Sequence, residues 1–570
     1  MSEIDDIINL VSKPSKDTFK KRIEYLRNER GMETSIIEEG VLKAEDAIKR
    51  NVKSFVIYGE PQSGKTEVMI ALTCKLVDMG FKTIFVVMND NSELETQNFL
   101  RFQQSQQLNP SPRRDFELHQ LEKSQLQQDK QRIIFCRKNS VNLQRLIENC
   151  RYMKKRIIID DEADFASVDT KINKTGEAST INKWLQKLGK LDEDGHYIGV
   201  TATPGRLDLN NTFRNNANEW IYLDAHKKYV GRSFFFPMGD EKSEYNLQLL
   251  PDEGDHPKYL RASILRFLLR STHLNFNNSD SEPKCFSMLI HTAGRMNDHL
   301  EDKKIVDKTI ELLSDPNDKG YRLLESLVEE AKKLYPDNDY RQKIIPYILK
   351  NIERSQVVVI NSKNDRANVE RACKPNVLYT FAIGGNIVSR GLTFENLLSF
   401  FFSRSVKGKL QQNTYIQRAR MFGTRPHVKD FELTIPHSLY ENWADCFQDH
   451  ELSVRLGKSG NLVHIERSTN RASDNASIDK NNIVIGRGER EIGEIFELTE
   501  EFEQFLINAK GSVIDIIEEA YRRNFITEKH FAKEILEFIK ETSKNLINDS
   551  TLVFLQPRGA DKPEIQNIGN

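Results

Sequence analysis

The chain has 570 residues, of which 38% are hydrophobic and 29% charged, and its formal net charge at pH 7 is −1. This length predicts about three or four structural units, and the net charge excludes a chain-wide basic field, so any nucleic-acid binding must come from local patches. Six cysteines are scattered without a CxxC pair, which argues for a reducing compartment and against a disulfide framework or a zinc ribbon.

The N-terminal region shows no export signal. It has acidic side chains where a signal peptide needs basic ones, and it contains no long apolar run. No stretch of the chain approaches the ~20 apolar residues of a membrane span. We therefore expect a soluble, cytoplasmic protein without membrane contact, and we expect residues 1–45 to form a charged helical extension.

Residues 46–225 have the pattern of one α/β domain. The run KSFVIYG predicts a buried strand, the next segment has helical spacing up to Gly80, and TIFVVMND predicts another strand. Strand, helix and strand at this spacing form a βαβ unit, which implies a parallel sheet. IIFC, RIIID and YIGVTATP add further buried strands, whereas the Gln-rich residues 103–131 predict a loop or insertion.

A second series of apolar runs predicts a second lobe over residues 281–440. Its expected strands are FSMLIHT, QVVVINS, VLYTFAIGG, LLSFFFS and FELTIP, with a helical insertion at about 298–355. Residues 226–280 are expected to be a linker that mixes a strand-like piece, SFFFP, with a helix, LRASILRFLLRST. Residues 441–570 are expected to be mainly helical and highly charged.

The segment GEPQSGKT has the composition of a phosphate-binding loop. Glycines let backbone N–H groups approach phosphate, a lysine reaches the β- and γ-phosphates, and a Ser or Thr holds Mg²⁺. A chance match in a chain of this length is expected about once in fifty, and the strand before it and the helix after it supply the required context. We predict an ATP site formed by Gly59, Gln62, Ser63, Gly64, Lys65 and Thr66.

The segment IIIDDEAD ends a buried strand with a run of acids. Ligands bind at the carboxyl ends of the strands in open α/β sheets. Asp161 is therefore expected to hold Mg²⁺, and Glu162 is expected to orient the attacking water. An acidic helix N-cap has similar letters, but the position downstream of a phosphate loop favours the catalytic interpretation.

Two further motifs follow predicted strands. VTATP places the hydroxyls of Thr201 and Thr203 where they can link the ATP site to movement between domains, although a threonine-rich strand end is the simpler interpretation. QRARMFGTRP is expected to place Arg420 on a helix and Arg425 in the turn after it. An arginine delivered to the γ-phosphate is worth ~10³-fold in rate, whereas an arginine-rich run is more often a solvated basic face.

The order of the motifs favours the catalytic role of both arginines. P-loop, DEAD, TAT, SRGL and QxxRxxxxR follow one another as in superfamily 2 helicases and translocases. Over about residues 50–450 the chain resembles the Z-one domain family, through VIYGEPQSGKTEVMIAL, IIIDDEADFAS, YIGVTATP, SMLIHTAGR, AIGGNIVSRGLTFENL and QRARMFGTR. The resemblance implies an α/β fold of two RecA-like parallel-sheet lobes with ATP and Mg²⁺ between them, and helical N-terminal, inserted and C-terminal elements.

The resemblance also assigns residues to the site. It matches the P-loop and the two acids given above, and it adds Ser389, Arg390 and Gly391 as motif V and Gln417, Arg420 and Arg425 as motif VI, with Gly391 and Gln417 at the nucleotide. The family's usual Gly-Arg-Trp-Phe-Gly-Tyr-Arg core near motif VI is Ala-Arg-Met-Phe-Gly-Thr-Arg here. The arginines are kept, but the aromatic residues around them are partly replaced.

Two segments concentrate positive charge. Residues 132–156 hold eight bases against one acid, and residues 403–429 hold seven bases and no acid. We favour nucleic-acid contact over a solvated face by about two to one. Loops around Asn89, Lys138, Asn139 and Arg295 are expected to grip the backbone, with little sequence preference.

These expectations combine into one function and two alternatives. We expect an ATP-dependent nucleic-acid translocase or helicase of a bacterial defence or restriction system, with DNA favoured over RNA. Members of the family sit beside nucleases and GHKL-type ATPases, which are the partners that the resemblance implies. A nucleotide-dependent switch that acts on partner proteins is the alternative. An intrinsic endonuclease, as the family is often labelled, is least favoured because no convincing carboxylate cluster occurs outside DEAD.

Overall fold

The computed structural model describes most of the chain. The described residues are 17–90, 92–105, 107–108, 110, 132–151, 153–165, 167, 171, 179–190, 194–203, 219–237, 243–251, 256–278, 282–292, 296–315, 320–360, 366–385, 392–403, 410–458, 471–472, 500–511, 513–527, 537, 553–558 and 562–567. No helix among them is both long enough and apolar enough to cross a bilayer.

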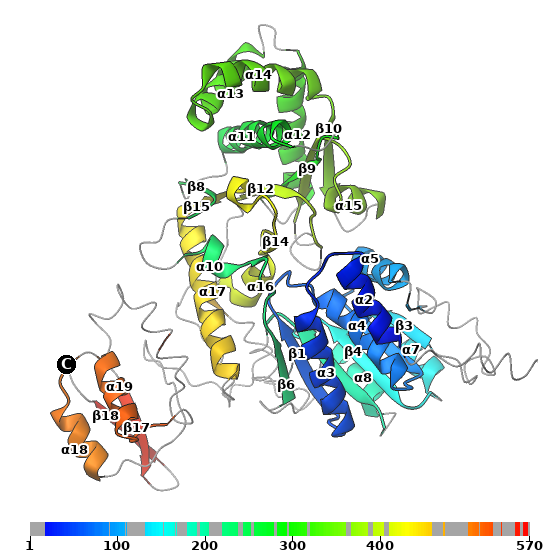
Figure 1. The fold of residues 1–570 in the computed structure, drawn as a ribbon, viewed down its shortest axis with the longest axis vertical. Coiled ribbons are helices and arrows are strands. Elements are labelled where there is room, and N and C mark those ends of the chain that lie inside the picture. The colour runs from blue at the N-terminus through cyan, green and yellow to red at the C-terminus, as the bar shows by residue number, and fades with distance from the viewer. Residues whose placement is uncertain are drawn as a thin grey trace, which may run out of the picture.

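The first lobe is a six-stranded sheet in the order β3-β2-β4-β5-β1-β6, and every neighbouring pair is parallel (Figure 1). Its strands are β1 (Ser54–Gly59), β2 (Thr83–Met88), β3 (Arg132–Arg137), β4 (Arg156–Asp161), β5 (His196–Thr201) and β6 (Trp220–Leu223). The strands are almost continuously apolar because helices cover both faces. These helices are α4 (Lys65–Asp78), α5 (Ser92–Gln104), α7 (Ser140–Cys150) and α8 (Thr180–Lys190).

Two N-terminal helices belong to the same core. α2 (Thr18–Asn28) and α3 (Ser35–Lys49) both pack on α4, and their buried side chains join the cluster that covers one face of the sheet. The Asp78 carboxylate at the end of α4 accepts from the backbone N–H groups of Thr18 and Phe19, at 3.0 and 2.9 Å. These bonds satisfy donors at the start of α2, which have no partner inside their own helix.

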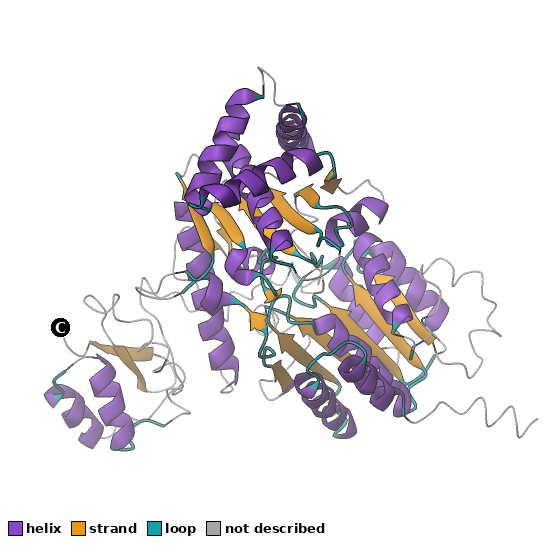
Figure 2. Ribbon diagram, turned by 45° about the horizontal axis from the view of Figure 1, so that its top comes forward, coloured by secondary structure: helices purple, strands orange, loops and turns teal. Residues whose placement is uncertain are grey.

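The second lobe is another parallel six-stranded sheet, in the order β10-β11-β9-β12-β15-β8 (Figure 2). Its strands are β8 (Asn246–Leu250), β9 (Phe286–His291), β10 (Ser355–Ile360), β11 (Tyr379–Gly384), β12 (Leu397–Phe402) and β15 (Glu432–Pro436). Its helices are α11 (Pro257–Phe276), α12 (Met296–Ser314), α13 (Tyr321–Leu334), α14 (Asn338–Asn351), α15 (Arg366–Cys373), α16 (Gln412–Gln417) and α17 (His437–Lys458). The chain therefore has two RecA-like lobes, as the motif order predicts.

The segment 226–280 differs from the linker that the sequence suggested. β8 pairs with β15 as an edge strand of the second sheet, and α11 packs on the same lobe. The strand-like piece SFFFP is wrong as a strand, since its first residues lie in a short helix, α10 (Arg232–Phe235). Its phenylalanines pack in one aromatic cluster, with Phe235 5.6 Å from Phe422 and Phe236 5.3 Å from Phe447 between ring centroids. That shared burial, and not alternation across a sheet, sets the local structure.

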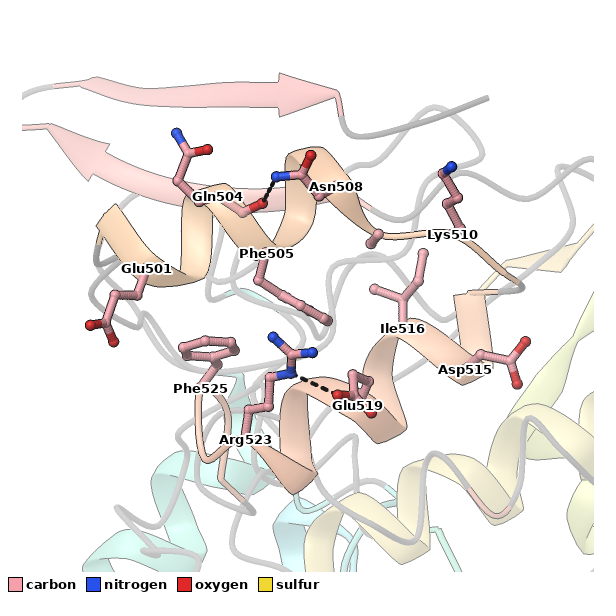
Figure 3. A pocket seen from close by; sticks show the side chains of 11 residues that line it. Glu501, Gln504, Phe505, Asn508, Lys510, Asp515, Ile516, Glu519, Arg523 and Phe525 are labelled. Atoms are coloured by element: carbon pink, nitrogen blue, oxygen red, sulfur yellow. Dashed lines mark hydrogen bonds and ion pairs between the residues drawn. The ribbon is translucent and has the colours of Figure 1, made fainter.

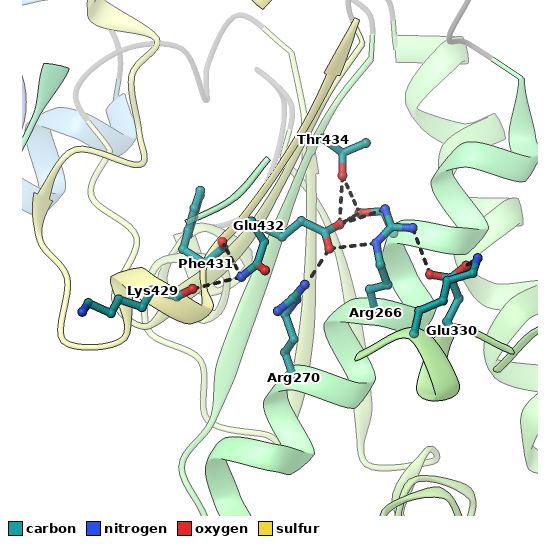
Figure 4. A network of polar contacts seen from close by, with 10 residues as sticks. Arg266, Arg270, Glu330, Lys429, Phe431, Glu432 and Thr434 are labelled. Atoms are coloured by element: carbon teal, nitrogen blue, oxygen red, sulfur yellow. Dashed lines mark hydrogen bonds and ion pairs between the residues drawn. The ribbon is translucent and has the colours of Figure 1, made fainter. Parts of the chain in front are cut away.

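A buried charge network ties three parts of the second lobe together (Figure 4). Arg266 on α11 donates two hydrogen bonds, of 2.8 and 3.0 Å, to the carboxylate of Glu432 at the start of β15. The same guanidinium reaches Glu330 on α13 at 3.4 Å, and Arg270 lies 3.6 Å from Glu432. A helix, a strand and the helical insertion are thus joined by paired charges, which a buried carboxylate requires.

The remaining pairs of strands are short. β7 (Tyr229–Val230) pairs antiparallel with β14 (Gly423–Thr424), and β13 (Leu410–Gln411) pairs with β16 (Arg471–Ala472). The C-terminal region contains α18 (Glu500–Asn508) and α19 (Val513–Arg522), and also an antiparallel hairpin of β17 (Val553–Arg558) and β18 (Lys562–Asn567). The expectation of a mainly helical C-terminal region did not include this hairpin.

Candidate nucleotide-binding site

The P-loop connects β1 to α4. Gly64 has a φ of 91°, which glycine adopts freely, and α4 begins at the next residue. A side chain on Gly59 would meet the Cγ atom of Lys65 at 3.0 Å and the Oγ atom of Ser63 at 3.1 Å, so Lys65 and Ser63 would have to shift to admit it. Backbone N–H groups at the start of α4 and the helix dipole favour an anion here.

Lys65 lies folded inside its own loop. Its Nζ atom donates to the carbonyl oxygens of Gly59 and Glu60, at 2.9 and 2.8 Å. Burial lowers the pKa of Lys65 to about 8, although Asp161 and Glu60 act in the opposite direction. An anion beside this ammonium group would restore its charge, which is the electrostatic condition for a phosphate site.

The acids of the DEAD segment follow β4 directly. Burial raises the pKa of Asp161 to about 7, and the neighbouring Glu162 adds to the effect. The Nδ2 atom of Asn98 on α5 lies 3.4 Å from a carboxylate oxygen of Asp161, and the side-chain amide of Asn89 donates to Glu162. The backbone of Glu162 has a φ of 51°, so its carboxylate leaves the strand in a tight left-handed turn.

Lys138 lies beneath this turn and not on a nucleic-acid surface. Its side chain is fully buried, 3.0 Å from Asp160, and its Nζ atom donates to the carbonyl oxygens of Asp161, Glu162 and Phe165 at 2.8–2.9 Å. The expectation that Lys138 grips nucleic acid is therefore wrong in this structure. An ammonium group with five oxygen partners, of which the fifth is the Ser167 hydroxyl at 3.2 Å, instead fixes the shape of the acidic turn.

Other residues that were expected to contact nucleic acid also have structural partners or are buried. Asn139 caps α7 by accepting from the N–H of Asn142 at 2.8 Å, and its amide donates to Asp90 at 2.9 Å. Arg132 and Arg156, which raised the basic count of their segment, are buried at 7% and 2% exposure. Part of that positive charge thus lies in the lobe interior. Arg295 lies outside the described residues.

Asp164 of the DEAD segment joins Thr201 to the second lobe. The Thr201 hydroxyl donates to Asp164 at 2.7 Å, and the second oxygen of the same carboxylate accepts from the Nε2 atom of Gln417 at 2.9 Å. The N–H of Thr203 donates back to the Thr201 hydroxyl at 2.9 Å. All four residues are buried. The strand end at 201–203 is therefore connected to the second lobe through Asp164.

The two motif VI arginines occupy different environments. Both follow α16, which ends at Gln417, so the expectation that Arg420 lies on a helix is wrong. Arg420 lines the cavity between the lobes and donates to the carbonyl oxygen of Leu392 at 3.0 Å. Arg425 donates to the carbonyls of Arg420, Met421, Phe422 and Phe394 at 2.5–3.2 Å, and burial lowers its pKa to about 10. In this conformation it braces the turn that carries Arg420.

The second lobe also contacts the P-loop itself. The Thr393 hydroxyl donates to the side-chain oxygen of Gln62 at 3.2 Å, and the Tyr229 hydroxyl donates to the carbonyl of Pro61 at 2.6 Å. A side chain on Gly423, whose φ is 111°, would approach the Gln62 carbonyl oxygen to 3.3 Å. The loop is therefore held between the two lobes. Gly391, Arg390 and Ser389 lie outside the described residues.

A cavity of about 560 Å³ opens at this junction. Its lining includes P-loop residues 61–67, both acids, and Gln417 and Arg420 from the second lobe. Sequence reasoning missed three groups that complete it, and these are Arg22, Tyr25, Arg30 and Met32 from the N-terminal extension, Asn98 and Arg101 from α5, and Val369, Glu370, Cys373 and Lys374 around α15. No motif marks them, because each reaches the cavity through tertiary packing alone.

The residues present fit a magnesium ion held with phosphate oxygens. Thr66 offers a hydroxyl and Asp161 a carboxylate in the same cavity, and the burial that raises the pKa of Asp161 also favours a cation beside it. Mg²⁺ in such sites takes one or two protein ligands together with substrate phosphates and water. Among the described residues no group of three or more His, Cys, Asp or Glu side chains could hold a metal by itself.

A second cavity lies in the C-terminal region (Figure 3). Phe505 on α18, Ile516 on α19 and Phe525 form its apolar part. At its rim Arg523 donates to Glu519 at 2.6 Å. No sequence motif pointed to this site.

The parallel sheets and the motif order define a superfamily 2 helicase-like ATPase fold. In agreement, a sequence model of the SWI2/SNF2 ATPase matches residues 38–225. A model of the Z1 domain matches residues 259–456, which confirms the resemblance to the Z-one domain family. No curated protein matches the sequence.

Solved helicase structures are similar to this chain at low sequence identity. S. cerevisiae Dbp5 bound to RNA and ADP BeF3 has 10% identity and a TM-score of 0.39, and covers 73% of this chain and 93% of its own. The Escherichia coli DEAH/RHA helicase HrpB has 11% identity and a TM-score of 0.39, covering 71% and 43%. The DUF1998 helicase MrfA bound to DNA has 10% identity and a TM-score of 0.43, covering 98% and 68%.

Proposed function

We propose that this chain is an ATP-dependent motor that moves on nucleic acid, with DNA favoured over RNA. The observation that carries the proposal is the cavity between the lobes, where the P-loop and the acids of one lobe face Gln417 and Arg420 of the other. The distances between the residues of such a site change when the lobes move. Nucleotide binding is therefore coupled to closure of the lobes, and hydrolysis to their opening.

The roles of the residues follow from their positions. The N–H groups at the start of α4 and the Lys65 ammonium bind the β- and γ-phosphates, for which Lys65 leaves the carbonyls of Gly59 and Glu60. Thr66 and Asp161 would hold Mg²⁺, which would supply positive charge beside the phosphates. Glu162 accepts a hydrogen bond from the attacking water and orients it in line with the γ-phosphate.

Arg420 supplies positive charge from the second lobe. It already lines the cavity, and a guanidinium beside the γ-phosphate stabilises the charge of the transition state. Arg425 acts through Arg420, because three of its bonds, to the carbonyl oxygens of residues 420–422, hold the turn between the two arginines. Gln62, Ser63, Gly391 and Gln417 complete the nucleotide contacts that the family resemblance assigns.

The nucleic-acid part of the proposal rests on the fold class and on charge. Five basic residues within 132–156 keep at least part of their surface exposed. They are Arg137, Arg145, Arg151, Lys154 and Lys155. They would contact phosphates and hence show little base preference. A role in bacterial defence or restriction, beside a partner nuclease or GHKL-type ATPase, is proposed from the family resemblance.

The test is the ATPase rate of the purified chain with and without single- and double-stranded DNA and RNA. We expect hydrolysis that depends on Mg²⁺ and increases with DNA. Lys65→Ala should abolish turnover by removing phosphate binding. Glu162→Gln should bind nucleotide normally and lose turnover by at least ~10²-fold. A rate that ignores every nucleic acid but responds to a partner protein would favour the switch, and plasmid cleavage would establish a nuclease.

A further inference from the structure

Asn89 is placed beside the proposed catalytic acid by the register of the sheet. β2 pairs with β4 so that Val87 lies opposite Asp160. Asn89 and Glu162 each follow directly on the last residue of these strands, and the Nδ2 atom of Asn89 donates to a Glu162 carboxylate oxygen. Asn89 is only 6% exposed. Because a carboxylate accepts and cannot donate, the contacting atom of the amide must be its nitrogen.

The other end of this amide is not satisfied. The Oδ1 atom of Asn89 is buried and has no hydrogen-bond partner among the described residues. A buried acceptor without a partner opposes the gain from the charged hydrogen bond at the other end. Among the described residues, Glu162 is therefore the one hydrogen-bond partner of this amide. A side chain in this situation responds to a modest change nearby.

The hydrogen bond affects the one group that has to act on water. A carboxylate oxygen that accepts a strong amide hydrogen bond is less available to a second donor in the same direction. Lys138 fixes the backbone of the acidic turn through the carbonyl oxygens of Asp161 and Glu162. Asn89 sets the direction of the Glu162 side chain. The backbone of Glu162 is thus fixed by Lys138, and its side chain is oriented by Asn89. The side chain is held by a single hydrogen bond from Asn89.

The residue after Asn89 faces the surface. Asp90 is about half exposed, with a side-chain exposure of 51%, and it accepts from the Asn139 amide at 2.9 Å and from Arg137 at 3.4 Å. The Arg137 guanidinium lies between Asp90 and Glu95, at 3.4 Å from each, and is 31% exposed. A phosphate group would compete with Asp90 for Arg137 and Asn139. The segment that carries Asn89 would then lose these side-chain contacts.

We propose that Asn89 is a positioning residue that restrains Glu162, and that nucleic-acid phosphate bound at Arg137 and Asn139 releases it through Asp90. The inference rests on the proposed function, since it needs an ATPase that nucleic acid stimulates. It assigns the coupling to one amide at the end of β2. The restraint lowers the rate without nucleic acid, and its release restores the direction in which Glu162 meets the attacking water.

The test compares ATPase rates of Asn89→Ala with those of the native chain, with and without DNA or RNA. We expect the rate without nucleic acid to rise by about tenfold and the stimulation ratio to fall towards one. The KM for ATP and the nucleic-acid concentration at half-maximal rate should stay unchanged. Asn89→Asp, which has the same shape and repels Glu162, should act in the same direction if the smaller variant unfolds. Gln144→Ala, an exposed amide on α7 that bonds Glu148, is the matched control.

Each outcome decides between the possibilities. A loss of both rates in the Asn89 variants, with nucleotide binding intact, would show that Asn89 only supports the acidic turn and would overturn the inference. An unchanged stimulation ratio in the Asn89 variants would overturn the inference as well. The proposed function would still stand in that case, because the native chain would still show ATPase activity stimulated by nucleic acid. A native rate that is indifferent to nucleic acid would instead remove the proposed function and the inference together.

Discussion

The side-chain amide of Gln417 in the second lobe donates a 2.9 Å hydrogen bond to the carboxylate of Asp164 in the first. The two residues are 253 positions apart in the chain. Asp164 also accepts from Thr201, so both of its oxygens are occupied, one by each lobe. The last residue of the DEAD segment is therefore hydrogen-bonded to both lobes.

Replacing Gln417 tests this contact. Gln417→Glu keeps the shape of the side chain but places a negative charge 2.9 Å from Asp164, which like charges oppose. We expect kcat to fall by ~10-fold or more, because lobe closure becomes unfavourable. Nucleotide affinity should change less, since the P-loop is intact. The measurement is steady-state ATPase kinetics together with nucleotide titration of each variant.

Gln417→Ala provides the comparison, since it removes the contact without adding repulsion. Its loss of kcat should be smaller than that of the glutamate variant. Equal effects of the two substitutions would show that charge at this junction does not control closure.

The pKa of Lys65 predicts how nucleotide binding depends on pH. In the free protein this pKa is about 8 because burial disfavours the ammonium form. A bound phosphate favours that form, so binding above pH 8 requires proton uptake. We expect the affinity for metal-free ADP to weaken by up to about tenfold per pH unit above pH 8. Calorimetry in buffers of different ionisation enthalpy would measure the proton uptake.

Lys65→Arg is the control for this titration, because a guanidinium stays charged across the range. The ADP affinity of this variant should be lower, because the guanidinium fits the loop less well, but it should not change with pH between 7 and 9. The same steep decline in the arginine variant would assign the titration to another group.

Arg101 on α5 is predicted to compete with the metal. Its Nη1 atom lies 3.4 Å from the Oγ1 atom of Thr66, the hydroxyl that is proposed to hold Mg²⁺, and burial lowers the pKa of Arg101. Two cations near one hydroxyl repel each other. Arg101→Gln should therefore lower the Mg²⁺ concentration at half-maximal ATPase rate by several-fold. A raised KM for ATP with unchanged Mg²⁺ dependence would mean instead that Arg101 binds phosphate.

The charge network around Glu432 predicts a large effect on stability far from the site. Arg266→Met leaves the buried Glu432 carboxylate with a weaker partner, and breaking such a pair costs ~3–5 kcal/mol. We expect the unfolding transition of the second lobe to move to lower denaturant concentration. Lys304→Ala, which removes an exposed pair with Glu301, should change stability by less than ~0.5 kcal/mol. Similar shifts in the two variants would contradict a special role of the buried network.

The sequence by itself determined five of the six strands of each sheet and the P-loop, whereas the edge strands β6 and β8 were not predicted. A buried parallel strand is a continuous apolar run, and a phosphate loop is a glycine pattern between a strand and a helix, so both signals lie within a few neighbouring residues. The Z1 domain could be recognised from the sequence for the same reason, because its motifs are contiguous stretches of the chain. Chain order also indicated that acids and arginines from different lobes share one site.

Only the tertiary structure decided which polar residues reach that site. Lys138 resembled a surface base in the sequence, yet it lies buried among carbonyl oxygens. Arg101 and Tyr25 carry no motif, yet both line the cavity. The physical reason is that the sign of a charge is local, whereas its burial and its partners depend on segments far away in the chain. For the same reason the contact between Gln417 and Asp164 exists only once both lobes have folded.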